Sequence, residues 1–144
     1  MPDRAYFDTS VLVKRYVQEE GSAHARALMR RRRVVSSAVA PLELLSAVTR
    51  RVAAGDLSDR ESAAIVLRAR QDRSHWELVE VSALVLDRAE ELMPATGLRT
   101  LDALHLASAV LVQAASTARI PFVTADAPLR QAAGATGLDV IWVG

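Results

Sequence analysis

The sequence predicts an α/β fold in which helices flank both faces of a mostly parallel central sheet. The first observation is that short apolar runs alternate with longer segments of helical periodicity along the whole chain. The second is size, because 144 residues, 51% of them hydrophobic and 24% charged, supply enough apolar surface for one core. Strands that alternate with helices pair in parallel, because each helix carries the chain back across the sheet. We therefore expect a single domain over residues 1–144.

Strands are predicted where short apolar runs are bounded by polar or turn residues. Apolar and polar residues alternate in the third run, which is typical of a half-buried strand, and each of the other runs contains two or more consecutive apolar residues. Five runs meet this description, at residues 5–7, 34–37, 76–81, 121–124 and 140–143.

Helices are predicted between these runs, where apolar residues recur three and four positions apart. Ser58 and Glu61 have the spacing of a capping box, so a helix is expected to begin there. Pro94 is expected to close one helix, and Thr100 to cap the next, which is long and apolar nearly all round. The remaining helices are predicted at residues 9–18, from 22 to the arginines at 30–33, from 41 to 55, and at 128–133.

The composition excludes several classes of chemistry. There is no cysteine, so disulfides, thiolate metal sites and a cysteine nucleophile are ruled out. The formal net charge of +1 neither demands nor forbids a nucleic-acid partner, since a local patch matters more than the total. The N-terminus has no apolar run typical of a signal peptide, and no segment is apolar enough over sufficient length to span a bilayer. We expect a cytoplasmic protein without membrane contact.

Four acidic residues fall at predicted junctions between a strand or loop and a helix. Asp8 directly follows the first strand, and Asp126 follows the fourth. Glu43 and Asp102 lie in the first turns of two helices. Strand-to-helix junctions gather at the carboxyl edge of an open α/β sheet, where such sheets bind ligands. We therefore expect the four carboxylates to converge in one acidic pocket.

Each of these acids also has a structural interpretation. The helix dipole favours an acid in the first turn, and Asp8 and Asp126 have the form of N-caps. Glu43 and Asp102 are not in cap positions, and they lie within apolar stretches where a lone charge is costly to bury. Two carboxylates about 4 Å apart repel by roughly 4 kcal/mol at an effective dielectric of about 20, and a shared cation removes this cost. Hard oxygen ligands favour Mg²⁺ or Mn²⁺ over zinc.

Four segments carry these acids, namely Tyr6–Lys14, Leu42–Leu44, Leu98–Ala107 and Phe122–Asp126. Together they resemble the PIN-domain ribonucleases, and most of all the VapC-type toxins of bacterial and archaeal toxin–antitoxin pairs. The run Leu-Asp-Ala-Leu-His-Leu-Ala in the third segment is the most specific of them. The resemblance extends over essentially the whole chain, and all four acidic positions match the family in order and spacing.

The resemblance implies a three-layer, Rossmann-like PIN fold. It also implies a Mg²⁺- or Mn²⁺-dependent endoribonuclease, the toxin of a type II toxin–antitoxin pair, with RNA as substrate and a VapB-like antitoxin as partner. Asp8 and Asp102 would be the principal metal ligands. Glu43 and Asp126 would complete the pocket directly or through water, and the hydroxyl of Thr124 would orient ligands or waters.

Several residues near these segments have two interpretations. Arg30–Arg33 either contact RNA backbone or form a solvated helix C-terminus. Arg99 either holds a phosphate or pairs with an acid. His105 lies on the same helical face as Asp102, and we favour a buried structural histidine over a general base. Lys14 is expected at the surface.

The two predicted helices after the second strand carry more apolar residues than one small core needs. Those residues serve core packing, the face of a homodimer, or a groove for a helix of the antitoxin. Trp76 and Trp142 are expected in the core or at an interface rather than as platforms for RNA bases. The apolar residues concerned are Leu44, Leu45, Val48, Ile65, Val66 and Leu67.

Other functions are less well supported by the same residues. A receiver-type phosphoacceptor domain would need paired acids after the first strand and a late lysine, but Asp8 stands alone and no lysine follows Lys14. The Gly-x-Ser-x-Gly signature of serine hydrolases and the phosphate-binding Gly-x-x-x-x-Gly-Lys loop are both absent. A related nuclease that acts on DNA and an inert metal- or RNA-binding module stay open as alternatives.

Overall fold

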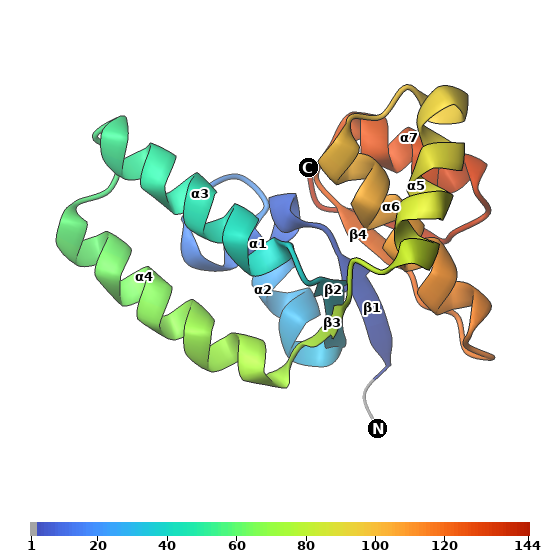
Figure 1. Cartoon of the computed structure of the whole chain (residues 1–144). Coiled ribbons are helices and arrows are strands. Elements are labelled where there is room, and N and C mark those ends of the chain that lie inside the picture. The colour runs from blue at the N-terminus through green and yellow to red at the C-terminus, as the bar shows by residue number, and fades with distance from the viewer. Residues whose placement is uncertain (1–2) are drawn as a thin grey trace.

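A parallel five-stranded sheet forms the centre of the computed structural model, which describes residues 3–144 (Figure 1). The strands lie in the order β3-β2-β1-β4-β5, and each neighbouring pair is parallel. The prediction of a mostly parallel sheet is therefore confirmed. The strands are β1 (Arg4–Phe7), β2 (Arg33–Ser37), β3 (Glu77–Val79), β4 (Phe122–Thr124) and β5 (Val140–Trp142).

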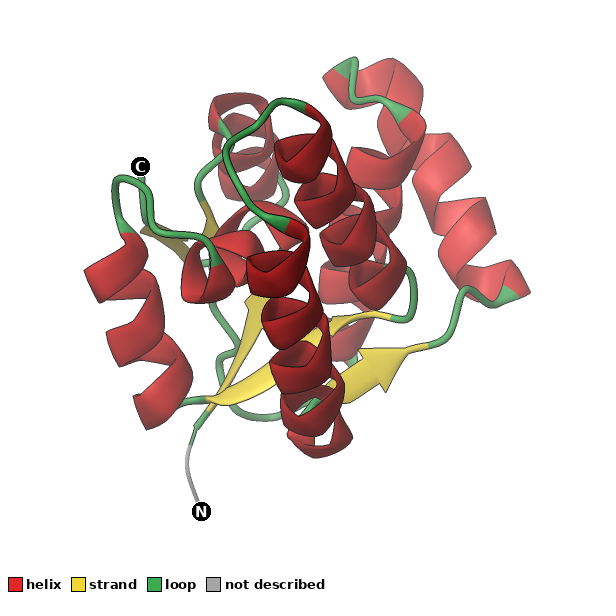
Figure 2. Cartoon of the chain, turned by 90° about the vertical axis from the view of Figure 1, so that its left-hand side faces the viewer, coloured by secondary structure: helices red, strands yellow, loops and turns green. Residues whose placement is uncertain are grey.

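Helices connect the strands and cover the sheet, which Figure 2 shows between helical layers. The helices of residues 3–144 are α1 (Thr9–Tyr16), α2 (Ser22–Arg31), α3 (Ala40–Ala53), α4 (Asp59–Asp72), the 3₁₀ turn η1 (Arg73–His75), α5 (Ala83–Thr96), α6 (Thr100–Ala114) and α7 (Ala127–Ala135). Within these residues, no helix combines the length and the hydropathy needed to cross a membrane.

Alternate residues of the central strand β1 face opposite layers of helices, as the two-residue period of a strand requires. Ala5 and Phe7 pack into a cluster with α1 and α2, together with Leu12. Tyr6 packs on the other face, in a cluster that includes Leu106 of α6. All of these side chains are fully buried, so β1 forms the middle of a three-layer structure.

Helices α3 and α4 lie side by side and project from the sheet on the side away from α5, α6 and α7 (Figure 1). Leu44 and Val48 of α3 are buried in a small separate cluster with Val17 and Ala69. The capping box predicted at Ser58 is present, because its hydroxyl accepts the N–H of Glu61 and the Glu61 side chain accepts the N–H of Ser58. Helices α3 and α4 therefore have a buried cluster of their own, and α4 begins at a defined N-cap.

The topological switch point, where the direction in which successive strands are added reverses, lies between β1 and β4. From β1 the chain builds outward through β2 to β3, and it then returns to add β4 on the other side of β1. Open α/β sheets bind ligands in the crevice beyond the carboxyl ends of the strands at such a switch point. Residues that follow β1 and β4 are therefore the best placed to form a site.

Three local predictions are wrong, each for a local reason. The helix expected to close at Pro94 continues to Thr96, because Gly97 with φ 71° supplies the left-handed cap and donates its N–H to the Met93 carbonyl. Thr100 is the first residue of α6, and Arg99 is its N-cap. The third strand is shorter than expected at both ends, because Trp76 is the C-cap of η1 and Glu80 and Val81 lead into Ser82, the N-cap of α5.

Lys14 is buried rather than at the surface, with 8% of its area exposed. Its Nζ lies 3.2 Å from Oε1 of Glu19 and donates to the Glu20 carbonyl at 2.6 Å. The turn between α1 and α2 folds back over the side chain, which sequence position alone did not indicate. The ammonium is thus paired with the turn that it helps to close.

Candidate active site

Asp8 is a buried carboxylate at the junction of β1 and α1. Its Oδ2 accepts the hydroxyl of Thr124 at 2.7 Å, and its Oδ1 accepts the hydroxyl of Ser10 at 2.5 Å. Oδ1 also accepts the N–H of Val11 at 3.4 Å, which confirms that Asp8 is an N-cap. Burial raises the pKa of Asp8 above its usual value, and the two hydroxyl hydrogen bonds oppose that rise.

Thr124 connects the two strands at the switch point. It is the last residue of β4 and is fully buried. Its hydroxyl donates to Asp8 and accepts the N–H of Asp126 at 3.0 Å. Asp126 in turn caps α7, because its Oδ1 accepts the N–H of Leu129 at 3.0 Å. Thr124 therefore holds together the carboxyl ends of β1 and β4.

Glu43 is bound to two side chains that come from other elements. It lies in the first turn of α3, and its Oε1 accepts the hydroxyl of Thr9 at 2.8 Å. The same oxygen lies 2.7 Å from Nε2 of His105. Because an ionised carboxylate only accepts hydrogen bonds, Nε2 carries the proton, and Nδ1 then accepts the hydroxyl of Tyr6 at 2.8 Å. A chain of hydrogen bonds thus runs from the core to Glu43.

These hydrogen bonds lower the pKa of Glu43. Partial burial acts to raise that pKa, but the hydrogen bonds from His105 and from the hydroxyl of Thr9 outweigh burial. His105 is 2% exposed, so the prediction that it is buried is confirmed. Its contact with Glu43 also makes it part of the candidate site.

Asp102 lies in the first turn of α6, one turn before His105, and is half-buried. Burial raises the pKa of Asp102, and the nearby charges of Asp126 and Glu43 raise it further. The positive charge of Arg99 opposes the rise. Neither Asp102 nor Glu43 caps its helix, as the sequence predicted. The acids whose charges raise this pKa, Asp126 and Glu43, lie at the beginnings of two other helices.

The donor chemistry of this region fits a hard divalent cation. Within residues 3–144, however, the side chains do not gather three or more histidine, aspartate or glutamate residues tightly enough to bind one metal ion directly. Mg²⁺ is usually held by one or two carboxylates and keeps several waters, so a tighter cluster is not required. Oδ2 of Asp8 accepts one hydrogen bond from the protein and retains a second lone pair.

Sequence reasoning assigned no function to Tyr6, and treated His105 only as a structural histidine or a general base. The Tyr6–His105 contact joins residues 99 positions apart, so no local pattern contains it. The one available signal was the spacing of His105 from Asp102, which places both on one helical face. That signal identified the histidine but not its partner.

The fold and these acids define the class of protein. The PIN domain family matches residues 5–135, and the chain belongs to this family. Ribonuclease VapC46 of Mycobacterium tuberculosis (strain ATCC 25618 / H37Rv) is 38% identical over 137 residues, which are 94% of this chain and 95% of that protein. Within the PIN family, the chain is thus of the VapC type.

Two solved structures share the fold. A toxin–antitoxin complex from Klebsiella pneumoniae has a TM-score of 0.59 at 18% identity, over 85% of this chain and 86% of that one. VapBC2 from Rickettsia felis, bound to a DNA fragment from the promoter, has a TM-score of 0.65 at 14% identity, over 97% and 98%. At these identities the likeness concerns the three-layer PIN fold, which confirms the expected fold class.

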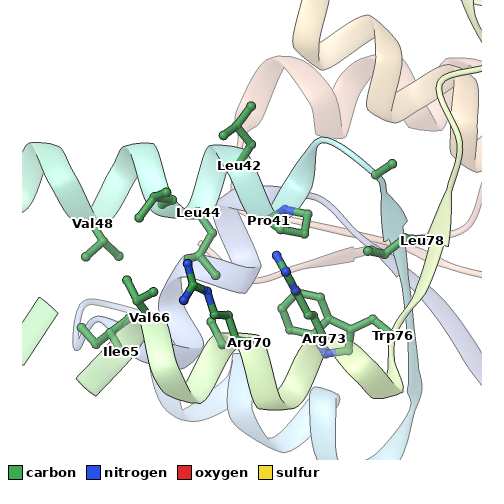
Figure 3. Close-up of a pocket in the computed structure, with 13 residues that line it drawn as sticks. Pro41, Leu42, Leu44, Val48, Ile65, Val66, Arg70, Arg73, Trp76 and Leu78 are labelled. Atoms are coloured by element: carbon green, nitrogen blue, oxygen red, sulfur yellow. The ribbon is translucent and has the colours of Figure 1, made fainter. Parts of the chain in front are cut away.

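An apolar groove lies between α3 and α4, with a volume of about 340 Å³, and we call it the α3–α4 groove (Figure 3). Leu44 and Val48 line it from the core side, so core packing accounts for these two residues. Leu45 and Leu42, which also belong to its lining, are exposed by 42% and 70%. The apolar residues of the two helices thus divide between a core and an open surface. Arg70 and Arg73 are the charged residues of the lining.

Proposed function

We propose that this protein is a metal-dependent endoribonuclease, the toxin of a type II toxin–antitoxin pair, which hydrolyses RNA phosphodiester bonds. One observation carries the proposal. Four acids follow strands or begin helices around the switch point of a VapC-type PIN fold, and burial and neighbouring charge perturb three of them. Carboxylates whose pKa values are perturbed in this way are typical of catalytic sites. We call the site that we propose for Asp8, Glu43, Asp102 and Asp126 the acid pocket.

The residues of the acid pocket have distinct proposed roles. Asp8 and Asp102 hold Mg²⁺ or Mn²⁺, and Glu43 and Asp126 complete the site directly or through water. When bound, the cation activates water and neutralises charge on the phosphate. Thr124 and Ser10 fix the orientation of the Asp8 carboxylate by the hydrogen bonds described above.

Glu43 is positioned to orient water. Its Oε1 is held by Thr9 and His105, whereas Oε2 accepts no hydrogen bond from residues 3–144. The lowered pKa of Glu43 keeps this carboxylate ionised at neutral pH. An ionised Oε2 accepts a hydrogen bond from a water molecule and aims that water's lone pair at the phosphorus.

Cleavage of RNA by the purified protein tests the proposal. We expect cleavage with Mg²⁺ or Mn²⁺, none with EDTA, and a loss of about 100-fold or more in Asp8→Ala and Asp102→Ala, because each removes a group that stabilises the transition state. Asp87→Ala, which removes an exposed acid on α5, is the matched control. Equal cleavage in all of these samples would overturn the proposal. DNA of the same sequence separates the alternative of a DNA nuclease.

We further propose that a segment of the cognate antitoxin occupies the α3–α4 groove. The groove is apolar along its length, and its charged residues are arginines, so it suits an amphipathic segment that carries acids. Pro41 and Leu42 belong to its lining and directly precede Glu43 of the acid pocket. An occupant of the groove would therefore lie beside the active site. Of the two solved structures, that from Klebsiella pneumoniae is a toxin–antitoxin complex, and that from Rickettsia felis is VapBC2 bound to promoter DNA.

A further inference from the structure

A second depression, of about 540 Å³, lies at the other end of the sheet from the acid pocket. It forms where α2 leads into β2 and where α4, through η1, leads into β3. The acids follow the carboxyl ends of strands, whereas this depression surrounds the amino ends of β2 and β3. Its lining includes five arginines, which we call the arginine pocket: Arg15, Arg26, Arg30, Arg32 and Arg33.

The positive charge of the arginine pocket is poorly compensated. Asp72 is the acid in its lining, and its carboxylate already accepts the hydroxyl of Tyr16 at 2.6 Å and Nε of Arg68 at 3.3 Å. Arg15 lies 4.0 Å from the same carboxylate. Arg26 donates to the neutral side chain of Gln18. Five guanidinium groups thus share part of one negative charge.

A helix dipole does not account for this arrangement. Arg30 lies in the last turn of α2, where a cation is favoured. Arg15 lies in the last turn of α1, where the same holds, but Arg26 lies in the middle of α2, and Arg32 and Arg33 come after its end. Arg30 and Arg33 are exposed and make no side-chain hydrogen bond or ion pair with residues 3–144. Cations from three elements converge on one hollow, and a bound anion would relieve their mutual repulsion.

We propose that the arginine pocket binds the phosphate backbone of the RNA that is cut at the acid pocket. Guanidinium groups match phosphate oxygens in paired hydrogen bonds, and a row of phosphates presents several anions at regular intervals. The exposed ring of His75 and the half-buried ring of Trp76 line the same hollow and offer surfaces to bases. These rings favour a nucleic acid over an acidic protein segment. The proposal rests on the ribonuclease function proposed above.

The separation of the two sites predicts a dependence on RNA length. The five residues of β2 span roughly 16 Å at about 3.3 Å per residue, and they lie between the two ends of the sheet. A four-nucleotide RNA bound at the acid pocket is too short to wrap past this distance to the arginine pocket. An RNA of 20 nucleotides can occupy both sites.

The test uses the full chain with the double substitution Arg30→Gln and Arg33→Gln. These exposed side chains have no partners within residues 3–144, so the fold does not depend on them. For the 20-nucleotide RNA we expect KM to rise about ten-fold with kcat unchanged, and the slope of log K against log salt to fall by about 1.4, which is about 0.7 for each lost phosphate contact. For the four-nucleotide RNA we expect no change. Arg60→Gln with Arg88→Gln, which removes the same charge from other exposed positions, is the control.

Binding of labelled RNA in EDTA separates this proposal from the ribonuclease function. One outcome is that wild-type protein cleaves no RNA, and that in EDTA the double variant loses RNA binding while the control variant keeps it. The ribonuclease proposal is then wrong, and the proposal for the arginine pocket is supported. If wild-type protein cleaves RNA and the double variant matches it in KM, salt slope and RNA binding, the proposal for the arginine pocket is overturned and the ribonuclease proposal is supported. If the double variant keeps RNA binding and loses the antitoxin, the pocket is a protein site and the proposal is overturned.

Discussion

At the residue scale, the hydrogen bonds around His105 join the core of the protein to a carboxylate of the acid pocket. Tyr6 is fully buried, and its hydroxyl satisfies Nδ1 of His105. The opposite ring nitrogen then donates to Glu43. A histidine whose two nitrogens are both engaged has a fixed tautomer and a fixed ring orientation. His105 therefore acts as a positioning residue for Glu43.

Replacing Tyr6 with phenylalanine tests this link. We expect Tyr6→Phe to lower the free energy of unfolding by about 1–3 kcal/mol, because it leaves a buried ring nitrogen without its partner. Urea titration measures the loss. Tyr16→Phe is the matched control, since the carboxylate partner of Tyr16 keeps a hydrogen bond from Arg68. Equal losses in the two variants would show that the Tyr6–His105 hydrogen bond contributes no more to the free energy of unfolding than the hydrogen bond of Tyr16 does.

Asp8 has an expected pH dependence whose sign follows from its raised pKa. The folded protein holds the proton of this carboxyl more tightly than the unfolded chain does, because burial raises the pKa. The resulting stability is present below the unfolded pKa of about 3.9 and is lost as pH rises through the folded pKa. At neutral pH the ionised carboxylate therefore lowers the stability of the metal-free protein.

We accordingly expect Asp8→Asn to raise the melting temperature of the metal-free protein at pH 7, and the difference from wild type to shrink toward pH 4. Asparagine keeps one oxygen for the N-cap of α1, and its NH2 can donate to the Thr124 hydroxyl, so the change removes the charge and reverses one hydrogen bond. Thermal melts across this range measure it. A melting temperature that falls equally at every pH would contradict the expectation and assign Asp8 a purely structural role.

At the scale of elements, α3 and α4 form a unit with one buried side and one open side. Leu44 and Val48 belong to the buried cluster between the two helices and α1, whereas Leu42, in the lining of the α3–α4 groove, is 70% exposed. The first turn of α3 also carries Glu43. One helix thus connects the surface proposed for the antitoxin to the acid pocket.

Substitution of an exposed leucine in the lining of the groove tests the proposed antitoxin contact. We expect Leu42→Asp to weaken binding of the antitoxin by at least about ten-fold, because it places a charge against an apolar partner surface. Leu84→Asp is the matched control, since Leu84 is 71% exposed on α5 and lies outside the groove. Calorimetric titration measures both affinities. Similar losses in the two variants would remove the α3–α4 groove as the docking surface.

At the scale of the whole molecule, the parallel sheet separates two regions of opposite charge. Asp8 and Asp126 follow the carboxyl ends of β1 and β4, and the arginine pocket surrounds the amino ends of β2 and β3. The formal net charge of +1 conceals this division, because acids and arginines nearly cancel in the sum.

Metal binding should appear in the stability of the whole fold. A cation that binds only the folded state stabilises it by about 2.7 kcal/mol at a concentration 100 times its Kd. We expect Mg²⁺ and Mn²⁺ to raise the melting temperature of wild-type protein, EDTA to reverse the effect, and Asp102→Asn to abolish it. Asp87→Asn should respond like wild type. A response to metal that survives in Asp102→Asn would place the cation elsewhere.

Local sequence patterns determined the elements and the order of the candidate acids. Strand alternation, the capping box at Ser58 and the N-caps Asp8 and Asp126 each depend on a few neighbouring residues, so the sequence alone indicates them. The same patterns failed at Pro94 and Lys14, where a glycine cap and a folded-back turn decide the outcome.

Only the tertiary structure decided which of these residues meet. The contacts of Thr124 with Asp8, and of His105 with Tyr6 and Glu43, join residues 116, 99 and 62 positions apart. Strand order and helix packing create such contacts, as they create the α3–α4 groove and the arginine pocket. The physical reason is that periodicity and capping act over a few residues, whereas a site is assembled by packing elements that are distant along the chain.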